Sequence, residues 1–391
     1  MTLVEQLRKD TPGCQKVVHL NNAGAALSPQ PVLQAVLDYL KLESQIGGYE
    51  AEMAQNDRLE SVYNSLARLV GGQPQEIALT QNATRAWDML VYAIDLQPGD
   101  RILTCRAEYA SNYIAFLQRA RKTGAEIVVL DNDDHGAVCL QSLKEHLDER
   151  VKLVAINHVP TNSGLVQPAA EIGKIVAGHP ALYLLDACQS VGQMPISVSE
   201  IGCDMLTATS RKFLRGPRGL GFLYIKEALI STLEPPFLDL HAAKWTEADS
   251  YTVRPDARRF ETYETFVAGR LGLAAAADYA LEVGQEWAWE RIQALSQRTR
   301  DGLQEVPGVS LHDLGAICGG IVTFTLGDSD AEEIREFLLS HHINVWSSSV
   351  FSARLDMEAR GLSRVVRVSP HYYNTEDEID LFLETLKRYP G

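Results

Sequence analysis

The sequence predicts an α/β protein built around a mostly parallel, seven-stranded sheet with helices on both faces. Three observations support this class. Seven short apolar runs recur between residues 77 and 225, helical stretches separate most of them, and most of the runs are apolar throughout. A strand covered on both faces has a continuous apolar run, whereas a strand with one exposed face alternates apolar and polar residues. Alternation of covered strands with helices is typical of a parallel sheet.

Two helices are expected before the sheet. Residues 17–22 form an extended segment in this interpretation, and an amphipathic helix follows over about residues 31–43. Gly47 and Gly48 break its pattern, and a second helix is expected over residues 55–70. The apolar face of the first helix is predicted to consist of Val32, Val36, Leu37 and Leu40.

The seven strands come next along the chain. Helical stretches join most of them, but the last two are joined by a loop that contains a lysine and several glycines. The expected strands are Ile77–Thr80, Arg101–Cys105, Glu126–Leu130, Leu153–Asn157, Leu182–Asp186, Met205–Ala208 and Gly221–Ile225.

The C-terminal part of the chain is predicted to form a smaller α+β domain. The large domain is expected over residues 21–264, and the small domain combines residues 1–20 with 265–391. After a long helix at 266–283, the expected elements are a helix at 286–305, a strand at 320–326, a helix at 331–341, strands at 343–346 and 364–369, and a helix at 375–388.

Composition and charge exclude several classes of protein. A net charge of −15 over 391 residues, with no basic stripe, argues against nucleic-acid binding. The six cysteines include no CxxC pair, so neither a metal site nor a disulfide framework is expected. The longest apolar segment is interrupted by Arg270 and Asp278, which argues against a membrane span. The amino terminus shows no apolar signal core, so a cytoplasmic location is expected.

One lysine lies in the loop between the last two strands. Lys212 follows the apolar run Met205–Ala208 and precedes a glycine-rich turn, Gly216–Gly221. The end of a buried strand in an open α/β sheet is a common place for a ligand pocket. Partial desolvation there lowers the pKa of an amine and makes it nucleophilic, as bonding to a carbonyl carbon requires. Considered alone, the pattern also fits a solvated loop lysine.

Two further features follow predicted strands. Asp186 ends an apolar run, and a buried carboxylate needs a cation or several donors to remain ionised. A protonated pyridine nitrogen would supply that cation, and a helix N-cap is the alternative. Asn82, Ala83 and Thr84 open a helix whose N–H groups and hydroxyl suit a phosphate, although threonine is also a common cap.

Tyr109 and Arg367 complete the set. Tyr109 follows the strand Arg101–Cys105 and either stacks on a heteroaromatic ring or belongs to the core. Arg367 lies on an apolar strand and needs a carboxylate partner. A substrate carboxylate held by two hydrogen bonds is one candidate, and a structural salt bridge is the other.

Taken together and in this chain order, these features resemble the fold-type-I enzymes of pyridoxal phosphate. They are the lysine with its glycine-rich turn, Asp186 with Gln189 three residues later, the Ala83–Thr84 helix start and the distal Arg367. The resemblance covers nearly the whole chain. It is closest to the class V aminotransferase group, which includes cysteine desulfurases, isopenicillin N epimerase and cyst(e)ine C–S lyases.

The resemblance implies pyridoxal 5'-phosphate as the cofactor and a role for each matching residue. Lys212 would bond to the cofactor and move the Cα proton of the substrate. Asp186 would hold the ring nitrogen, Gln189 would approach the ring oxygen, and Tyr109 would cover the ring. The phosphate ligands would be Ala83, Thr84, Thr209 and Arg211.

The implied substrate is a small molecule, a sulfur-containing amino acid, and the implied assembly is a homodimer with shared active sites. Arg367 would bind the substrate α-carboxylate, with Asn22 nearby. Phe260–Glu264 corresponds to a loop that reaches the phosphate of the neighbouring subunit in the family. The usual Gly-Thr is Tyr263-Glu264 here, which leaves that contact open.

Departures from the family pattern narrow the function. Cysteine desulfurases have a histidine where this chain has Arg211, and usually another where it has Tyr109. The family's asparagine near the ring oxygen is replaced by Thr161. The loop that carries the persulfide-forming cysteine of desulfurases corresponds to Val345–Val350, which has serines and no thiol. Because a serine hydroxyl stays protonated where a thiolate forms readily, persulfide transfer through an enzyme cysteine is not expected.

Four stretches most resemble the C–S lyase subgroup of ergothioneine biosynthesis, which cleaves hercynylcysteine sulfoxide. They are Gly47–Glu52, Glu108–Asn112, Ser210–Gly219 and Arg367–His371. The implied reaction is β-elimination on a cysteine S-conjugate or its sulfoxide, which gives a sulfur product, pyruvate and ammonia. An aminotransferase or an epimerase is the alternative within the family, and a cysteine desulfurase is a less favoured one. A non-catalytic protein of the same fold is the alternative from another class.

Overall fold

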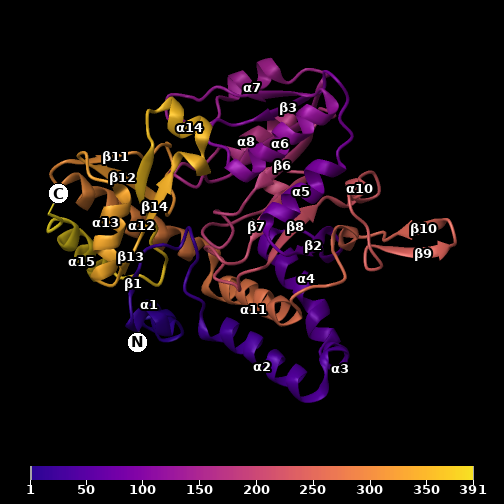
Figure 1. The fold of residues 1–391 in the computed structure, drawn as a ribbon, viewed down its shortest axis with the longest axis horizontal. Coiled ribbons are helices and arrows are strands. Elements are labelled where there is room, and N and C mark those ends of the chain that lie inside the picture. The colour runs from indigo at the N-terminus through magenta and orange to yellow at the C-terminus, as the bar shows by residue number, and fades with distance from the viewer. Residues whose placement is uncertain (1, 391) are drawn as a thin grey trace.

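The computed structural model describes residues 2–390, and a seven-stranded mixed sheet lies at its centre (Figure 1). The strand order is β2-β8-β7-β6-β5-β3-β4. The strands are β2 (Ile77–Thr80), β3 (Arg101–Thr104), β4 (Glu126–Val129), β5 (Val151–Asn157), β6 (Leu182–Asp186), β7 (Met205–Thr209) and β8 (Gly221–Ile225). The predicted fold class and all seven predicted strands are confirmed.

Within this sheet only β8 runs antiparallel to its neighbours, β2 and β7. The loop at residues 210–220 joins β7 to β8. It is shorter than the roughly dozen residues that a parallel crossover requires, so the chain turns straight back. This reversal places the lysine loop at the carboxyl ends of the parallel strands.

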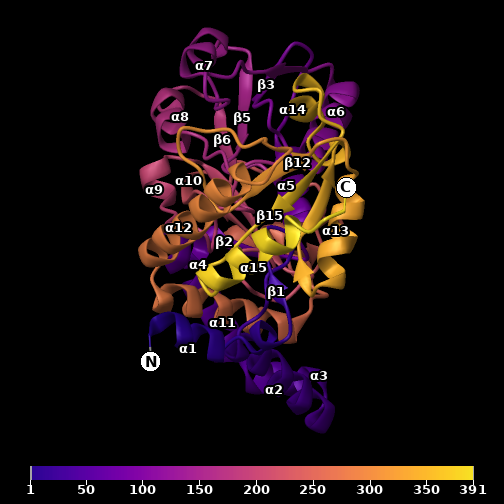
Figure 2. The same cartoon turned by 90° about the vertical axis from the view of Figure 1, so that its left-hand side faces the viewer.

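Apolar side chains on both faces of the sheet explain the continuous apolar runs. Leu103, Val154 and Leu206 belong to one core cluster, while Ile102 and Leu153 belong to the other. Successive side chains of a strand point to opposite faces, so each strand contributes to both cores. Figure 2 shows helices on either side of the sheet. One cluster includes residues of α4 (Asn56–Val70), α8 (Ala169–Val176) and α11 (Val267–Val283), and the other includes α5 (Ala83–Ala93) and α6 (Ala110–Thr123).

The C-terminal part contains a second, antiparallel sheet of four strands in the order β11-β12-β15-β14. β1 (Val18–His19) pairs with β13 (Ile343–Asn344), so the start of the chain returns to this part of the molecule. The domain boundaries given above stay a prediction. The strands are β11 (Val309–Leu311), β12 (Val322–Leu326), β14 (Trp346–Ser349) and β15 (Arg364–Val368), with helices α12 (Gln285–Gln304), α13 (Ala331–Ser340), α14 (Arg354–Ala359) and α15 (Glu376–Leu386).

The predicted buried face of the first long helix is wrong in part. α2 spans Gln30–Ile46 and buries Val32, Ala35 and Tyr39, whereas Leu37 and Leu40 are 49% and 40% exposed. α2 packs against α11, and the Val32–Ala35–Tyr39 stripe faces that partner. The leucines therefore lie on the other side of the helix. The predicted break at Gly47-Gly48 is confirmed, because α2 ends at Ile46 and Gly47 has φ = 100°, outside the helical range. The short helix that follows, α3 (Gly48–Ala54), was not predicted.

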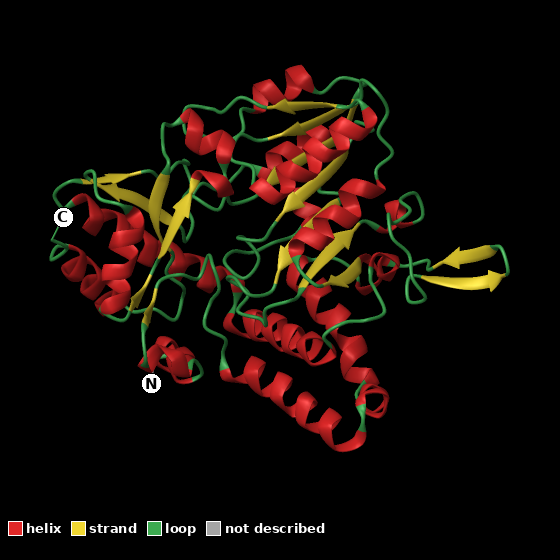
Figure 3. Cartoon of the chain, in the orientation of Figure 1, coloured by secondary structure: helices red, strands yellow, loops and turns green. Residues whose placement is uncertain are grey.

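A two-stranded hairpin is an element that the sequence did not indicate. β9 (Ala243–Glu247) and β10 (Ser250–Val253) pair only with each other, and they project from the body of the molecule (Figure 3). Their residues are mostly exposed, so they lack the apolar pattern of a core strand. The remaining helices are α1 (Leu3–Lys9), α7 (Leu140–His146), α9 (Val198–Ile201) and α10 (Glu227–Ile230). Over residues 2–390, no helix has both the length and the apolar character needed to span a bilayer.

Candidate active site

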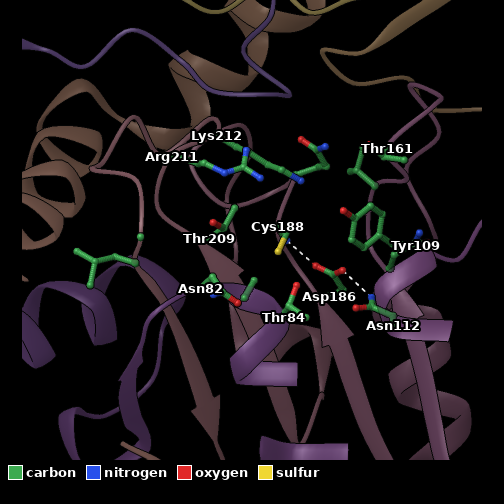
Figure 4. Close-up of a pocket in the computed structure, with 16 residues that line it drawn as sticks. Asn82, Thr84, Tyr109, Asn112, Thr161, Asp186, Cys188, Thr209, Arg211 and Lys212 are labelled. Atoms are coloured by element: carbon green, nitrogen blue, oxygen red, sulfur yellow. Dashed lines mark hydrogen bonds between the residues drawn. The ribbon is translucent and has the colours of Figure 1, made fainter. Parts of the chain in front are cut away.

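A cavity lies at the carboxyl ends of the parallel strands and at the N-termini of α5 and α6 (Figure 4). Such an edge is where open α/β sheets bind ligands. Every residue predicted to bind the cofactor lines it. The lining consists of Asn82, Ala83, Thr84, Tyr109, Asn112, Asn157, Val159, Thr161, Asp186, Cys188, Gln189, Thr209, Arg211, Lys212, Gly219 and Leu220.

Lys212 lies in the β7–β8 loop, and its side chain borders this cavity. Removal of its ammonium group from bulk water lowers its pKa from 10.5 to about 8, and the positive charges of Arg211 and Arg367 act in the same direction. A larger fraction of the amine is therefore neutral and nucleophilic near neutral pH than in a solvated lysine. The alternative of a solvated loop lysine does not fit this position.

A buried arginine holds the lysine loop in shape. Arg215 has φ = 64°, in the left-handed region that few non-glycine residues adopt. Its guanidinium donates to Leu27 O (2.9 Å), Tyr372 Oη (2.9 Å) and Thr11 Oγ1 (2.5 Å). These partners come from both ends of the chain, so the loop that carries Lys212 is connected to the N-terminal segment and to the C-terminal part.

Asp186 is the last residue of β6, and its carboxylate accepts two hydrogen bonds. Its Oδ1 accepts from the Cys188 N–H (2.9 Å), and its Oδ2 accepts from Asn112 Nδ2 (2.8 Å; Figure 4). The next helix begins only at Val198, so the alternative of a helix N-cap does not apply. The carboxylate is thus oriented by two hydrogen bonds on one side while it borders the cavity on the other.

The N-terminus of α5 forms a second wall of the cavity. Asn82 caps the helix by accepting from the Arg85 N–H (2.8 Å). A Cβ atom on Gly221 would lie 2.8 Å from Ala83 N, so only glycine allows β8 to pass this close to the helix start. The free N–H groups of this helix start, with the hydroxyls of Thr84 and Thr209, are donors of the kind that phosphates bind.

Arg367 has no carboxylate partner within 4 Å anywhere in residues 2–390. It is 5% exposed and donates to Thr161 O (3.1 Å), Thr161 Oγ1 (2.9 Å) and Asn21 Oδ1 (3.4 Å). Burial lowers its pKa to about 10, with the charge of Arg211 as the next cause. The alternative of a structural salt bridge is therefore not seen. A buried cation without an anion suits an anionic ligand.

The geometry does not favour the substrate role predicted for Asn22. Its amide is fully buried and donates to Ser369 O (2.7 Å) and His19 O (3.3 Å), while its oxygen accepts from Tyr373. Like Arg367, it is not among the residues that line the cavity. The preceding residue, Asn21, is the one that contacts Arg367. All polar atoms of the Asn22 amide are used to join the N-terminal segment to the C-terminal part.

Other predicted residues border the cavity with different contacts. Gln189 donates to Ala23 O (3.2 Å), and its Oε1 is buried without a hydrogen-bond partner in the described chain. Tyr109 is only partly buried at the start of α6, so it is not a core residue. Thr161 accepts from Arg367, and its contact with a cofactor stays a prediction. Arg211 donates to Gly24 O.

Sequence reasoning missed Asn112 and Asn157, which also line the cavity. Asn157 joins the chain after β3 to β5, because its oxygen accepts from the Cys105 thiol and its amide donates to Ala107 O. Asn112 follows Glu108 by four residues, which is one helical turn. This four-residue spacing just after a strand end is the sequence signal that the side chains of Glu108 and Asn112 lie close together.

The family follows from comparison with known proteins. The sequence profile described as aminotransferase class-V matches residues 18–382. The chain belongs to the class V aminotransferase family.

Relatives of this class V chain include proteins named as probable cysteine desulfurases. One from Synechocystis sp. is 30% identical over 392 residues, which cover 95% of this chain and 90% of that protein. One from Pyrococcus abyssi is 28% identical over 394 residues, which cover 99% and 98%. The apo structure of the cysteine desulfurase from Thermococcus onnurineus NA1 has a TM-score of 0.93 at 28% identity, with 99% of this chain and 98% of that chain covered.

Membership of the class V family assigns pyridoxal phosphate as the cofactor, and the cavity fits it. The positive charges of Arg211 and Arg367 lower the pKa of Lys212, and the charge of Arg211 lowers the pKa of Arg367, so these three groups lie close together. Asp186 supplies a carboxylate beside them. This excess of positive charge suits a phosphate and a substrate carboxylate. The donors at the start of α5 and the open side of Asp186 offer separate places for a phosphate and a ring nitrogen.

Proposed function

We propose that this class V enzyme is a C–S lyase, which cleaves a cysteine S-conjugate or its sulfoxide by β-elimination. The products would be a sulfur compound, pyruvate and ammonia. The observation that carries this proposal is the combination of a cavity lysine, Lys212, with a segment, Val345–Val350, that has serines and no thiol where desulfurases carry their reactive cysteine. A desulfurase must accept sulfur on a thiolate, whereas an eliminating enzyme releases the sulfur group directly.

The serine segment lies in and after β14. Ser347 and Ser348 are buried, and Ser348 Oγ donates to Asn162 Oδ1 (2.5 Å). Cys188 lines the cavity, but burial raises the pKa of its thiol well above 9.0. Burial also raises the pKa of Cys318. Both thiols therefore stay protonated near neutral pH and are poor sulfur acceptors.

The proposed roles follow from the contacts. Arg367 binds the substrate carboxylate and so fixes Cα near Lys212, which removes the Cα proton. Asp186 holds the protonated ring nitrogen of the cofactor. Bound pyridoxal phosphate supplies an electron-withdrawing group that stabilises negative charge at Cα. The C–S bond then breaks, the sulfur group leaves with its electron pair, and the released aminoacrylate takes up water to give pyruvate and ammonia.

Pyruvate formation tests this proposal. With an S-substituted cysteine as the only substrate, the enzyme is expected to form pyruvate and the sulfur product in equal amounts, as a coupled lactate dehydrogenase assay and mass spectrometry would measure. Blocking accessible thiols with iodoacetamide is expected to leave this rate within about twofold, because no thiolate takes part. Transfer of the amino group to an added keto acid without pyruvate would instead establish an aminotransferase.

Cysteine desulfurase is the second candidate, because relatives and a similar structure have that name. A desulfurase converts cysteine to alanine and leaves a persulfide on the protein. Alanine formation from free cysteine, abolished by iodoacetamide, would favour this candidate over the lyase. Racemisation of an amino acid without loss of sulfur would identify an epimerase.

Within the lyase proposal, hercynylcysteine sulfoxide is the substrate that the motif resemblance favours. Arg367–His371 is one of the four supporting stretches, yet His371 is fully buried and its Nε2 lies 2.8 Å from Phe213 O. It therefore supports the lysine loop and does not reach a ligand. Assay of this sulfoxide beside S-methylcysteine sulfoxide tests the subgroup, and equal kcat/KM values would contradict it.

The proposal includes a homodimer. A group of apolar side chains on α2, α3 and the loop before α11 is exposed, including Leu37 at 49%, Tyr49 at 69% and Tyr263 at 48%. Leu40, Tyr49, Tyr263 and Phe266 border one hollow, so these elements form a continuous surface. Exposed apolar surfaces of this kind mark protein interfaces. We expect a second copy of the chain to cover this surface, because the family resemblance implies a homodimer.

Substitution of Leu37 tests the homodimer. The Leu37→Glu variant is expected to raise the dimer dissociation constant at least about tenfold, because it places a charge in a desolvated apolar interface. Size-exclusion chromatography with light scattering across a dilution series measures this change. Leu381→Glu is the matched control, since Leu381 is 43% exposed on α15, away from this surface. A monomeric wild-type protein, or equal dissociation constants for both variants, would contradict the proposed interface.

A further inference from the structure

A buried carboxyl group next to Asp186 has no part in the proposed reaction. Glu108 is 2% exposed and lies between the end of β3 and the start of α6. Its Oε1 accepts from the Tyr109 N–H (2.8 Å) and from Asn112 Nδ2 (2.9 Å), and its Oε2 is hydrogen-bonded to Thr104 Oγ1 (2.9 Å). Two of these three partners, Tyr109 and Asn112, also line the cavity.

One amide group connects the two carboxyl groups. Asn112 Nδ2 donates one hydrogen to Glu108 Oε1 (2.9 Å) and the other to Asp186 Oδ2 (2.8 Å). Asn112 is 3% exposed, so water does not replace either bond. Both hydrogens of the amide are used, which determines the orientation of the side chain and, through it, one oxygen of Asp186.

We propose that Glu108 is a positioning residue for Asp186: it acts through the Asn112 amide and accepts the hydrogen bond of that amide in its neutral form. This inference rests on the proposed role of Asp186. A neutral Glu108 accepts from Asn112 without adding a second negative charge beside the ring nitrogen. An ionised Glu108 would place a second negative charge next to Asp186 and repel it.

The surroundings of Glu108 favour its neutral form. Burial is the main cause, and the charge of Asp186 is the next, of a rise in the Glu108 pKa from 4.5 to about 8. The other titratable group facing it is the Cys105 thiol, whose pKa is itself raised by burial. The hydrogen bonds from Asn112, the Tyr109 N–H and Thr104 lower the Glu108 pKa, but they offset only part of the rise that burial and Asp186 cause.

The raised pKa has a definite effect on stability. Between pH 4.5 and about 8 the folded protein keeps the Glu108 proton while the unfolded chain loses it. Stability from this group is therefore complete below pH 4.5 and is lost as the pH rises to about 8. Glutamine has the same shape and does not titrate, so Glu108→Gln avoids this loss.

Melting of the cofactor-free protein tests the neutral state. The melting temperature of Glu108→Gln minus that of the wild type is expected to increase by at least about 3 °C between pH 5.5 and 8.5. Glu149→Gln, at an exposed position, is the matched control and is expected to show a constant difference. A constant difference for Glu108→Gln would overturn the neutral assignment. This result does not depend on which reaction the enzyme catalyses.

Cofactor affinity tests the positioning role. Glu108→Ala is expected to raise the dissociation constant of pyridoxal phosphate at least about tenfold, whereas Glu108→Gln stays within about threefold, because only glutamine still accepts from Asn112. In an Asn112→Ala background, Glu108→Ala is expected to have no further effect. Equal affinities of Glu108→Ala and wild type, or full additivity of the two substitutions, would overturn the inference. Absence of lyase activity with these affinities intact would contradict only the proposed reaction.

Discussion

Replacement of Lys212 with alanine is expected to lower the rate of pyruvate formation by about 10³-fold or more. General acid–base catalysis by one side chain contributes about 10²- to 10⁴-fold, and Lys212 is also the attachment point proposed for the cofactor. No other lysine of the described chain lines the cavity. The substitution therefore removes the proposed base and the covalent bond together.

The attachment itself is measured by mass spectrometry after borohydride reduction. The wild type is expected to gain the mass of the reduced cofactor on the peptide that contains Lys212, and Lys212→Ala is expected to gain none. Lys144→Ala, at an exposed position on α7, is the control and is expected to behave like the wild type. A label on another lysine would refute the assignment, and so would undiminished activity of Lys212→Ala.

The second large effect is expected for Arg367→Gln. Loss of one partner of a buried charge pair costs about 2–5 kcal/mol, so kcat/KM is expected to fall about 10²- to 10³-fold. Arg367→Lys is expected to recover only part of this loss, because an ammonium group cannot make two parallel hydrogen bonds to a carboxylate. Steady-state kinetics with one S-substituted cysteine measures both variants.

A substrate analogue that lacks the carboxylate distinguishes a loss of carboxylate binding in Arg367→Gln from a general loss of activity. The decarboxylated amine analogue is expected to react slowly and at the same rate with wild type and Arg367→Gln, since it has no group for Arg367 to bind. The cofactor-free variant is expected to melt no earlier than the wild type, because Arg367 is a buried cation without a carboxylate partner in residues 2–390. A variant that loses the same factor with both substrates would show that Arg367 acts elsewhere.

Local sequence patterns predicted the fold correctly wherever a strand is covered on both faces. The runs that became β2, β6 and β8 have the predicted bounds, because a strand covered on both faces must be apolar throughout. The pattern was insufficient where burial is one-sided. On α2, apolar residues occur on both the buried and the exposed face, and contact with α11 decides which face is covered. The β9–β10 hairpin has no core face, so no apolar period indicates it.

Residue type and chain order alone were enough to propose the cavity residues Lys212, Asp186 and Thr84. These side chains follow strand ends, and the carboxyl ends of parallel strands meet at one edge of the sheet. Asn22 was assigned from the family resemblance alone, but its contacts are set by Ser369 and Tyr373, which are more than 300 residues away. Neighbouring asparagines look alike in a sequence, and only packing determines which of them faces Arg367.

By itself, the sequence of this protein determined the α/β class, the seven strands of the central sheet and many of the residues that line the cavity. The tertiary structure decided which polar atoms are already paired. Within residues 2–390 it leaves Arg367 without a carboxylate partner, uses every polar atom of the Asn22 amide, and joins Glu108 and Asp186 through the amide of Asn112. The physical reason is that local periodicity reports burial, whereas the charge and reactivity of a group depend on neighbours brought together only by folding.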